Sequence, residues 1–193
     1  LNWFTAFDVL GEHFRIIAPD HRGHGKGISS KNPFRLEDCA DDVAAIAAFL
    51  AEVRDGKPSS VPVYDHHTYD IIDEVVEVGY VDVLIFEGVN ALQFHDAFDV
   101  SVYLHADEPI MRAWFIQRTS TLRDAARTDY SPFFDPWTDV PEDLFLEMVN
   151  GAWELVNLPN LLEHIEPTRP LAHAVIEWEA DHTIRSITIR EPT

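Results

Sequence analysis

A single carboxylate follows a strongly apolar stretch of this sequence. Glu87 comes directly after residues 81–86, an aliphatic and β-branched run that only Asp82 interrupts. Such a run predicts a strand buried on both faces, in the middle of a parallel sheet. Glu87 would then lie at the carboxyl end of the strand, where open α/β sheets bind their ligands. A carboxylate there ligates Mg²⁺ or its waters, or accepts hydrogen bonds from a substrate. The alternative is a surface acid at a strand end.

Phenol and imidazole groups gather just upstream of this strand. Residues 62–70 read Pro-Val-Tyr-Asp-His-His-Thr-Tyr-Asp and include Tyr64, His66 and Tyr69. These side chains donate directional hydrogen bonds without adding a full charge, which suits the hydroxyl, amide and carboxylate groups of a small polar substrate. The alternative is a structural turn with aromatic packing.

A guanidinium is the third candidate for chemistry. Arg118 lies near the middle of a helix that we expect from Asp107 to about Arg127. The planar, permanently charged guanidinium is suited to a carboxylate or a phosphate. Alternatively, the arginines of this helix pair with the many acidic residues at the surface, where such pairs contribute little.

These segments resemble the type I (bacterial) pantothenate kinases, which belong to the P-loop group that also holds uridine kinase and phosphoribulokinase. The resemblance extends over about residues 49–190 and rests on 62–70, 81–93, 114–118 and 157–170. It implies a P-loop-kinase-like fold and ATP- and Mg²⁺-dependent phosphoryl transfer to a hydroxyl in coenzyme A biosynthesis. It also implies a small-molecule substrate and a homodimer. No apolar run approaches 18 residues and no signal peptide is visible, which predicts a soluble cytoplasmic protein.

The resemblance implies a role for each matching residue. Glu87 would ligate Mg²⁺ or its waters. Arg118 would reach both the acceptor and the transferring phosphoryl group. The acceptor-binding residues would be Tyr64, His66, Tyr69, Phe134 and Asn157.

The acceptor pocket departs from the family pattern. Phe115 replaces a tyrosine, and Asp65 replaces a serine. Three family phenylalanines are replaced by Thr119, Leu122 and Arg127. Much of the aromatic wall is therefore absent, which leaves the identity of the acceptor open.

The sequence has no Gly-x-x-x-x-Gly-Lys-Ser/Thr motif. Gly25-Lys26 comes nearest, but Asp20 takes the place of the first glycine and Gly27 that of the Ser/Thr. Pro33 also opposes the long helix whose N-terminal amides would bind phosphates. If residues 1–20 follow the family order of helix, strand and aspartate, Asp20 would be the general base for the acceptor hydroxyl.

Residues 14–46 also resemble an α/β-hydrolase, through Phe-Arg-Ile-Ile-Ala-Pro-Asp-His-Arg-Gly-His-Gly and the helix that follows. No Gly-x-Ser-x-Gly elbow comes after it, so acyl transfer would lack its nucleophile. Residues 1–48 are therefore either hydrolase-like or a degenerate nucleotide-side segment. Besides a kinase, a hydrolase-derived or fused fragment and a non-catalytic protein that binds pantothenate- or CoA-like ligands or a partner remain open.

The charge balance excludes some partners. The chain has 34 acidic and 14 basic residues, a net charge of −20, which should repel nucleic acid and anionic membranes. The single cysteine, Cys39, excludes an internal disulfide.

The expected architecture is one α/β domain over residues 1–193, with a mainly parallel sheet between helices and an antiparallel C-terminal strand pair. Helices are expected at 2–13, 36–54, 107–127 and 141–156. Strands are expected at 14–18, 81–86, 98–104, 171–178 and 183–190, and 71–78 is expected to be extended chain before the strand at 81–86.

Overall fold

The computed structural model describes residues 16–17, 36–65, 70–131 and 133–190, with side chains in 43–62, 73–131 and 133–190. By its internal contacts the chain divides into two compact units, Leu1–Ala97 and Phe98–Thr193. Each unit is described by itself, and the expected single domain stays a prediction. Both units combine helices with strands, so the chain is an α/β protein, as the sequence predicts.

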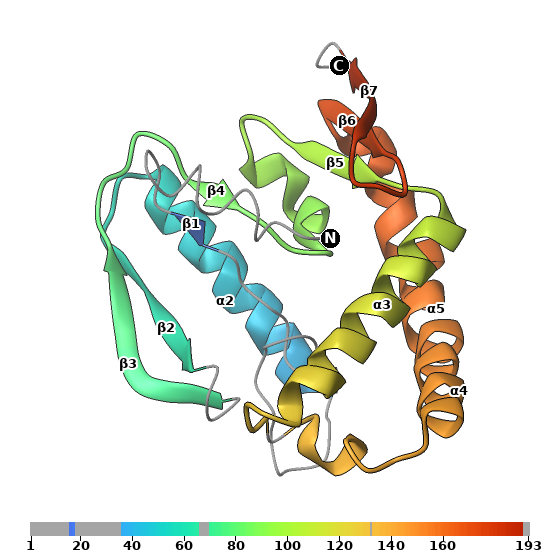
Figure 1. Cartoon of the computed structure of the whole chain (residues 1–193). Coiled ribbons are helices and arrows are strands. Elements are labelled where there is room, and N and C mark those ends of the chain that lie inside the picture. Colours follow the sequence, from blue (N-terminus) through green and yellow to red (C-terminus); the bar gives the residue numbers. More distant parts are fainter. Residues whose placement is uncertain (1–15, 18–35, 66–69, 132, 191–193) are drawn as a thin grey trace. The chain divides into compact units, whose positions relative to one another are not determined.

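The first unit holds one long helix, two strand pairs and a short helix (Figure 1). The parallel pair is β1 with β4, and the antiparallel pair is β2 with β3. The bounds are β1 Ile16–Ile17, α2 Leu36–Arg54, β2 Ser59–Asp65, β3 Asp70–Val78, β4 Ile85–Phe86 and the 3-10 helix η1 Ala91–Ala97.

Helix α2 has the bounds that its apolar periodicity and acidic first turns predict. Gly56 ends it at φ 70°, a left-handed conformation that glycine adopts without steric cost. The amide of Lys57 donates to the carbonyl oxygen of Glu52 at 2.9 Å, which satisfies one of the last carbonyls of the helix. This tight turn leads the chain back along α2 as strand β2.

Residues 71–78 are extended chain, as predicted, but the prediction missed that they form a paired strand. These residues belong to β3, which pairs with β2 over the register from Ser59↔Val78 to Asp65↔Asp70. Val78 is fully buried in this hairpin, whereas Val75 is 60% exposed. One face of the hairpin is therefore packed and the other is not, which an antiparallel pair tolerates.

The prediction of a long strand buried on both faces at 81–86 is wrong. Only Ile85 and Phe86 form β4, and Val83 is 50% exposed. Just before the strand, the hydroxyl of Tyr80 donates to the Asp82 carboxylate at 3.2 Å. Asp82 lies in a bend, and the apolar run enters the sheet only at its end.

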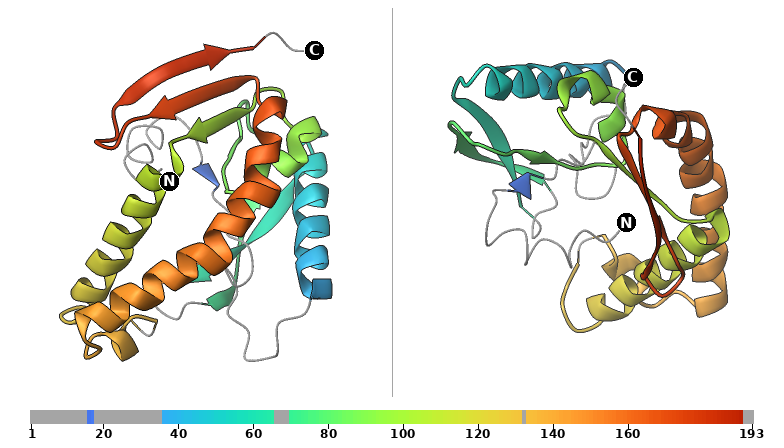
Figure 2. Two further views of the ribbon diagram at one scale, coloured as in Figure 1. Left: turned by 90° about the vertical axis from the view of Figure 1, so that its right-hand side faces the viewer. Right: turned by 90° about the horizontal axis from the view of Figure 1, so that it is seen from above.

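The second unit contains a three-stranded sheet of order β5-β6-β7 (Figure 2). Strand β6 runs parallel to β5 and antiparallel to β7, which confirms the predicted C-terminal antiparallel pair. The elements are β5 Val102–His105, α3 Glu108–Ala126, the 3-10 helix η2 Asp135–Trp137, α4 Glu142–Ala152, the π-helical turns η3 Trp153–Asn157 and η4 Leu161–Ile165 around α5 Leu158–Asn160, the 3-10 helix η5 Glu166–Leu171, β6 Ala174–Trp178 and β7 Ile184–Ile189.

Asp107 occupies the predicted N-cap position of α3, but its side chain makes no capping hydrogen bond. Its carboxylate instead accepts two hydrogen bonds from Arg185, both at 3.2 Å. A fixed positive charge is a stronger partner than a neutral backbone amide. Asp107 therefore ties the start of α3 to strand β7.

The helical stretch that begins with α4 keeps one buried face over a long distance. Phe145, Val149, Trp153 and Leu161 are all buried, at intervals of four or eight residues. In a regular α-helix, residues four apart drift around the axis. The π-helical turns η3 and η4 widen the helix, which helps residues four apart to stay on the same face.

Charged and polar side chains gather near the carboxyl ends of β5 and β6. Glu177 of β6 pairs in register with His105 of β5. Its carboxylate accepts hydrogen bonds from the Ser186 hydroxyl at 2.9 Å and from the Arg169 guanidinium at 2.8 Å. Both contacts lower the pKa of Glu177 below its ordinary value of 4.5, and the hydrogen bond from Ser186 has the larger effect.

We expect Ser186→Ala to raise the pKa of Glu177 toward 4.5, because the largest contact that favours the ionised form is lost. Because folding lowers the pKa of Glu177, the ionised carboxylate stabilises the folded state at any pH above the pKa that Glu177 has in the unfolded chain. This stabilisation is lost as the pH falls through the pKa that Glu177 has in the folded chain. The variant should therefore lose less stability on acidification below about pH 4.5. Carboxyl-carbon NMR titration measures the pKa, with Thr188→Ala on the same strand as control. An unchanged pKa in Ser186→Ala would contradict the assignment.

Candidate functional site

Tyr64 lies in strand β2, one residue before the strand ends at the connection to β3. Its register partner is Ile71, one pair before the last pair of the ladder, and the ladder shifts in register between Pro62 and Tyr64. Such an irregularity bends the strand locally. His66 and Tyr69 belong to the connection between β2 and β3 and lie outside the described residues.

Glu87 follows β4 directly and is half-buried. It lies at the carboxyl end of β4, which runs parallel to β1, as its predicted role requires. Residues 88–91 then form a turn in which the amide of Ala91 donates to the Gly88 carbonyl oxygen at 3.1 Å. Beyond the turn, Phe94 packs edge-on against Phe86, with ring centroids 6.4 Å apart.

Asn90 offers a second oxygen in the same turn. Its side-chain oxygen Oδ1 is buried and has no hydrogen-bond partner among the described residues. An asparagine just before a helix usually caps the helix through this oxygen, but here it does not. Oxygen atoms are the ligands that Mg²⁺ and its waters take. Glu87 and Asn90 thus place two oxygen-bearing side chains in one turn, and a role of either in binding Mg²⁺ stays a prediction.

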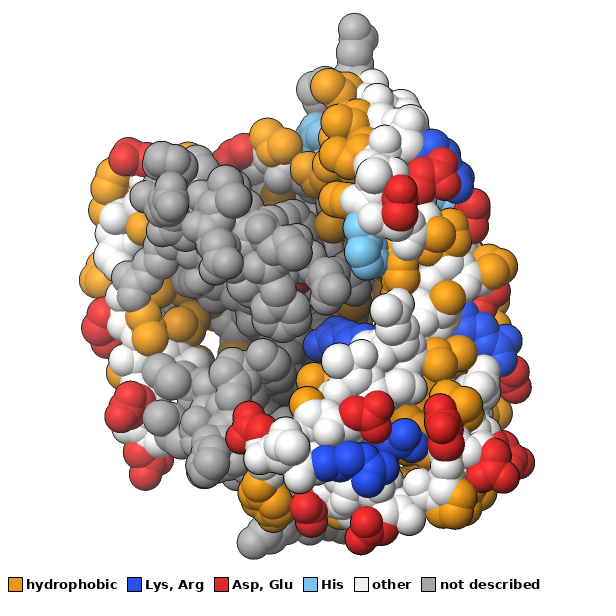
Figure 3. Space-filling view, in the orientation of Figure 1, with side chains coloured by type: hydrophobic (Ala, Val, Ile, Leu, Met, Phe, Trp, Pro, Cys, Tyr) orange, Lys and Arg blue, Asp and Glu red, His pale blue; other side chains and the backbone are white. Residues whose placement is uncertain are grey.

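Arg118 lies near the middle of α3 and is exposed. Two other arginines of the helix have structural partners: Arg112 donates to the side-chain oxygen of Asn150 and pairs with Glu154 at 2.8 Å. Arg123 is 5% exposed and stacks on Phe145, 4.3 Å from the ring centroid. The alternative of surface ion pairs thus describes Arg112 and also Arg127, which pairs with Asp124 at 3.6 Å. Arg123 is a buried cation whose guanidinium also pairs with Asp124, at 3.2 Å. Figure 3 shows the interleaved acidic and basic side chains of this unit.

The two remaining candidates of the second unit lie in helical turns. Phe134 is buried before η2, with its ring edge-on to Phe133 at 4.9 Å between centroids. Asn157 ends the π-helical turn η3, and its side-chain amide donates to the carbonyl oxygen of Ala152 at 3.3 Å. That bond leaves the side-chain carbonyl of Asn157 as an acceptor for a ligand.

Sequence reasoning missed His105. His105 is the last residue of β5, and its register partner in β6 is Glu177. Its imidazole lies 4.0 Å from the Asp107 carboxylate. Burial, and then the charge of Arg169, lower the pKa of His105 below its ordinary value of 6.5, which favours the neutral ring. The signal that could have revealed it is a histidine at the end of an apolar strand, directly before a helix N-terminus.

The candidates are thus distributed over both units. Tyr64 and Glu87 belong to Leu1–Ala97, and Arg118, Phe134 and Asn157 to Phe98–Thr193. Their convergence on one cleft stays a prediction. Asp20 lies outside the described residues.

Two further searches cover the described part of the chain. There, no three His, Cys, Asp or Glu side chains are grouped closely enough to hold a metal ion. No helix within these ranges is long and apolar enough to cross a membrane.

Comparison with known proteins gives a consistent result. The family model described as "Phosphoribulokinase / Uridine kinase family" matches residues 29–129. Proteins named pantothenate kinase match at 33% identity over 165 residues in Agrobacterium fabrum, covering 78% of this chain and 51% of that protein. In Rhodopseudomonas palustris the identity is 37% over 164 residues, which cover 77% of this chain and 52% of that protein. In Lactococcus lactis subsp. cremoris the identity is 34% over 159 residues, which cover 78% of this chain and 52% of that protein.

The chain spans about half the length of the curated relatives that it matches. The resemblance of residues 14–46 to an α/β-hydrolase is not supported, because the kinase family model already covers the chain from residue 29, within that segment. The hydrolase pattern consists of a strand, a loop and an acidic helix start, and this order is shared by many α/β proteins.

Proposed function

Because the chain belongs to the phosphoribulokinase/uridine kinase family, we propose that it carries the acceptor side of a pantothenate kinase, an enzyme that transfers a phosphoryl group from ATP to a hydroxyl of pantothenate. The observation that carries this proposal is the match to relatives named pantothenate kinase over 77–78% of the chain. The reaction would serve coenzyme A synthesis in the cytoplasm, where ATP is available, and the homodimer stays a prediction.

In this proposal Tyr64, His66 and Tyr69 hold the polar groups of pantothenate by directional hydrogen bonds. Phe134 covers its apolar part, and Asn157 accepts a hydrogen bond through its side-chain oxygen. Orientation by several such groups lowers the barrier because the acceptor hydroxyl no longer has to be brought to the phosphate by diffusion.

The charged residues have complementary roles. Asp20 would accept the proton of the attacking hydroxyl. Arg118 would bind the acceptor and would neutralise charge on the transferring phosphoryl group. Glu87 and Asn90 would hold Mg²⁺ or its waters, and the bound ion would shield the negative charge of the ATP phosphates.

Calorimetry and a coupled assay for ADP test the proposal on the 193-residue chain. We expect saturable heat on titration with pantothenate and no comparable heat with uridine. The coupled assay shows whether ADP also forms from ATP–Mg²⁺ in the presence of pantothenate. Uridine is the matched control, because uridine kinase belongs to the same family.

Two outcomes would change the assignment. If uridine binds and pantothenate does not, the acceptor is wrong. If pantothenate binds but ADP does not form, the chain is a non-catalytic pantothenate-binding protein. The absence of the Gly-x-x-x-x-Gly-Lys-Ser/Thr motif from these residues is the observation that favours this second candidate.

A further inference from the structure

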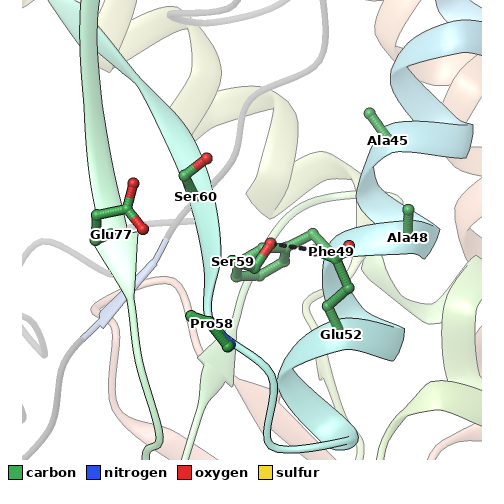
Figure 4. Close-up of a pocket in the computed structure, with 8 residues that line it drawn as sticks. All are labelled: Ala45, Ala48, Phe49, Glu52, Pro58, Ser59, Ser60 and Glu77. Carbon is green, nitrogen blue, oxygen red and sulfur yellow. Dashed lines mark hydrogen bonds between the residues drawn. The ribbon is translucent and has the colours of Figure 1, made fainter.

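The proposed function uses neither a pocket of the first unit nor the outer face of a helical stretch in the second. The pocket, of about 470 Å³, lies beside α2 and the β2–β3 hairpin (Figure 4). Its lining consists of Ala45, Ala48, Phe49, Glu52, Pro58, Ser59, Ser60 and Glu77. The Ser59 hydroxyl donates to Glu52 at 2.6 Å, a contact that belongs to the fold and indicates no particular ligand. The outer face of the helical stretch indicates more.

An apolar row follows the outer face of α4 and the turn η3, which form one continuous helical stretch (Figure 2). Leu144, Met148, Leu155 and Val156 are between 36% and 80% exposed. Their spacing of four, seven and one residues places them along one side of the stretch. Exposed apolar residues that occur singly need no explanation, whereas a contiguous row of this kind is typical of an interaction site.

Gly151 lies in this row, between Met148 and Leu155. A glycine inside a helix costs about 0.5–1 kcal/mol of stability relative to alanine. No described residue requires it here, because a Cβ atom at this position would meet nothing within 4 Å. Without a side chain, the helix has a shallow place in its surface that another backbone can approach closely. The row is therefore shaped for a partner outside the described residues.

The charges beside the row are negative. Residues 142–165 contain five acidic residues and neither lysine nor arginine. Glu154 pairs with Arg112 of α3 at 2.8 Å, whereas Asp143 and Glu147 are exposed beside the row. A second copy of this chain would bring the same carboxylates together, and an anionic membrane would be repelled in the same way. The complementary occupant is a basic one.

We propose that this face docks a basic amphipathic helix of a partner protein. The apolar side of the partner helix packs over Gly151, between Met148 and Leu155. Its lysines or arginines pair with Asp143 and Glu147 at the border of the contact. The row from residue 144 to residue 156 is about 18 Å long, which matches about three turns of the partner helix. This inference uses residues of the second unit only and does not rest on the proposed kinase function.

A leucine–lysine peptide of about 18 residues with helical periodicity is the probe, since shorter helices are marginal in water. The chain has two methionines, so methyl-labelled methionine gives two NMR signals, from Met148 in the row and from Met111 of α3. We expect a saturable shift of the Met148 methyl on titration of the full chain with the peptide, and no shift of Met111. A shuffled peptide of the same composition should leave both signals unchanged, because it has the charge without the apolar side.

Two pairs of variants separate the apolar contact from the charge. Leu155→Gln should weaken peptide binding about tenfold, whereas Ile187→Gln, at a residue of β7 that is 58% exposed, should leave it unchanged. Glu147→Gln should weaken binding about two- to threefold at low salt and less at high salt. Asp129→Asn removes the same charge outside the face and should have no effect.

Several results would overturn the proposal. These are the absence of a saturable Met148 shift, equally strong binding of the shuffled peptide, and equal weakening by Leu155→Gln and Ile187→Gln. If Met148 responds instead to phosphatidylcholine vesicles, the face binds a membrane. If it responds instead to the protein's own concentration, with a dimer in sedimentation velocity, a second copy occupies the face.

Discussion

Phe145→Ala should lower the free energy of unfolding of the second unit by about 3–5 kcal/mol. Phe145 is 2% exposed, and its ring lies 4.3 Å below the guanidinium of Arg123, a residue that is itself only 5% exposed. The substitution creates a cavity and also removes the aromatic partner of a buried cation. Arg123 would keep its ion pair with the Asp124 carboxylate at 3.2 Å, but its Nη1 has no hydrogen-bond partner in the described part of the chain.

Urea unfolding followed by tryptophan fluorescence measures this loss. Phe145→Leu keeps an apolar side chain without the aromatic face and should cost about 1–2 kcal/mol, which separates packing from the cation–π contact. Leu144→Ala is the matched control, because Leu144 is the preceding residue of α4 and 50% exposed. Equal losses in Phe145→Ala and Leu144→Ala would show that the Arg123–Phe145 stack does not lie in the stabilising core.

Arg118→Gln should raise the Kd for pantothenate about 10- to 100-fold. The affinity falls because the variant loses a hydrogen-bonded charge pair with the carboxylate of the acceptor or with its neighbouring groups. Glutamine retains hydrogen-bond donors but no charge. This expectation rests on the proposed function, and calorimetric titration with pantothenate measures it.

Arg112→Gln provides the control for Arg118. Arg112 lies on the same helix, but its guanidinium is bound to Asn150 and Glu154, so its loss should leave the affinity for pantothenate unchanged. If both variants weaken binding equally, the effect comes from the charge of helix α3 as a whole. If Arg118→Gln leaves the Kd unchanged, Arg118 does not contact the acceptor.

Helices were the part of the fold that could be predicted best. The alanine-rich periodicity of 36–54 and the Asp-Glu-Pro start at 107–109 led to the observed α2 and α3. Helical hydrogen bonds join residues four apart, so the decisive information is local in the sequence. The antiparallel pair β6–β7 was predictable for a similar reason, because a short polar turn separates two apolar runs.

Strand lengths and partners were predicted less well. The run 81–86 contributes only Ile85–Phe86 to a strand, and 71–78 became one arm of a hairpin. A strand is stabilised by a neighbour that lies elsewhere in the sequence, and apolar content alone does not reveal which residues that neighbour reaches.

The candidate residues themselves could be chosen from the sequence. The order of residue types along the chain is enough to recognise a carboxylate after an apolar run, a segment with tyrosines and histidines, and an arginine in a helix. By itself the sequence therefore determined the α/β class, the family and the chemical kinds of side chain available. Only the tertiary structure decided that His105 meets Glu177, that Asn90 has a buried oxygen without a partner within the described residues, and that Glu52, Ser59 and Glu77 line one pocket. The physical reason is that strand register and helix packing bring together side chains that are far apart along the chain, through contacts whose energies depend on shape and burial.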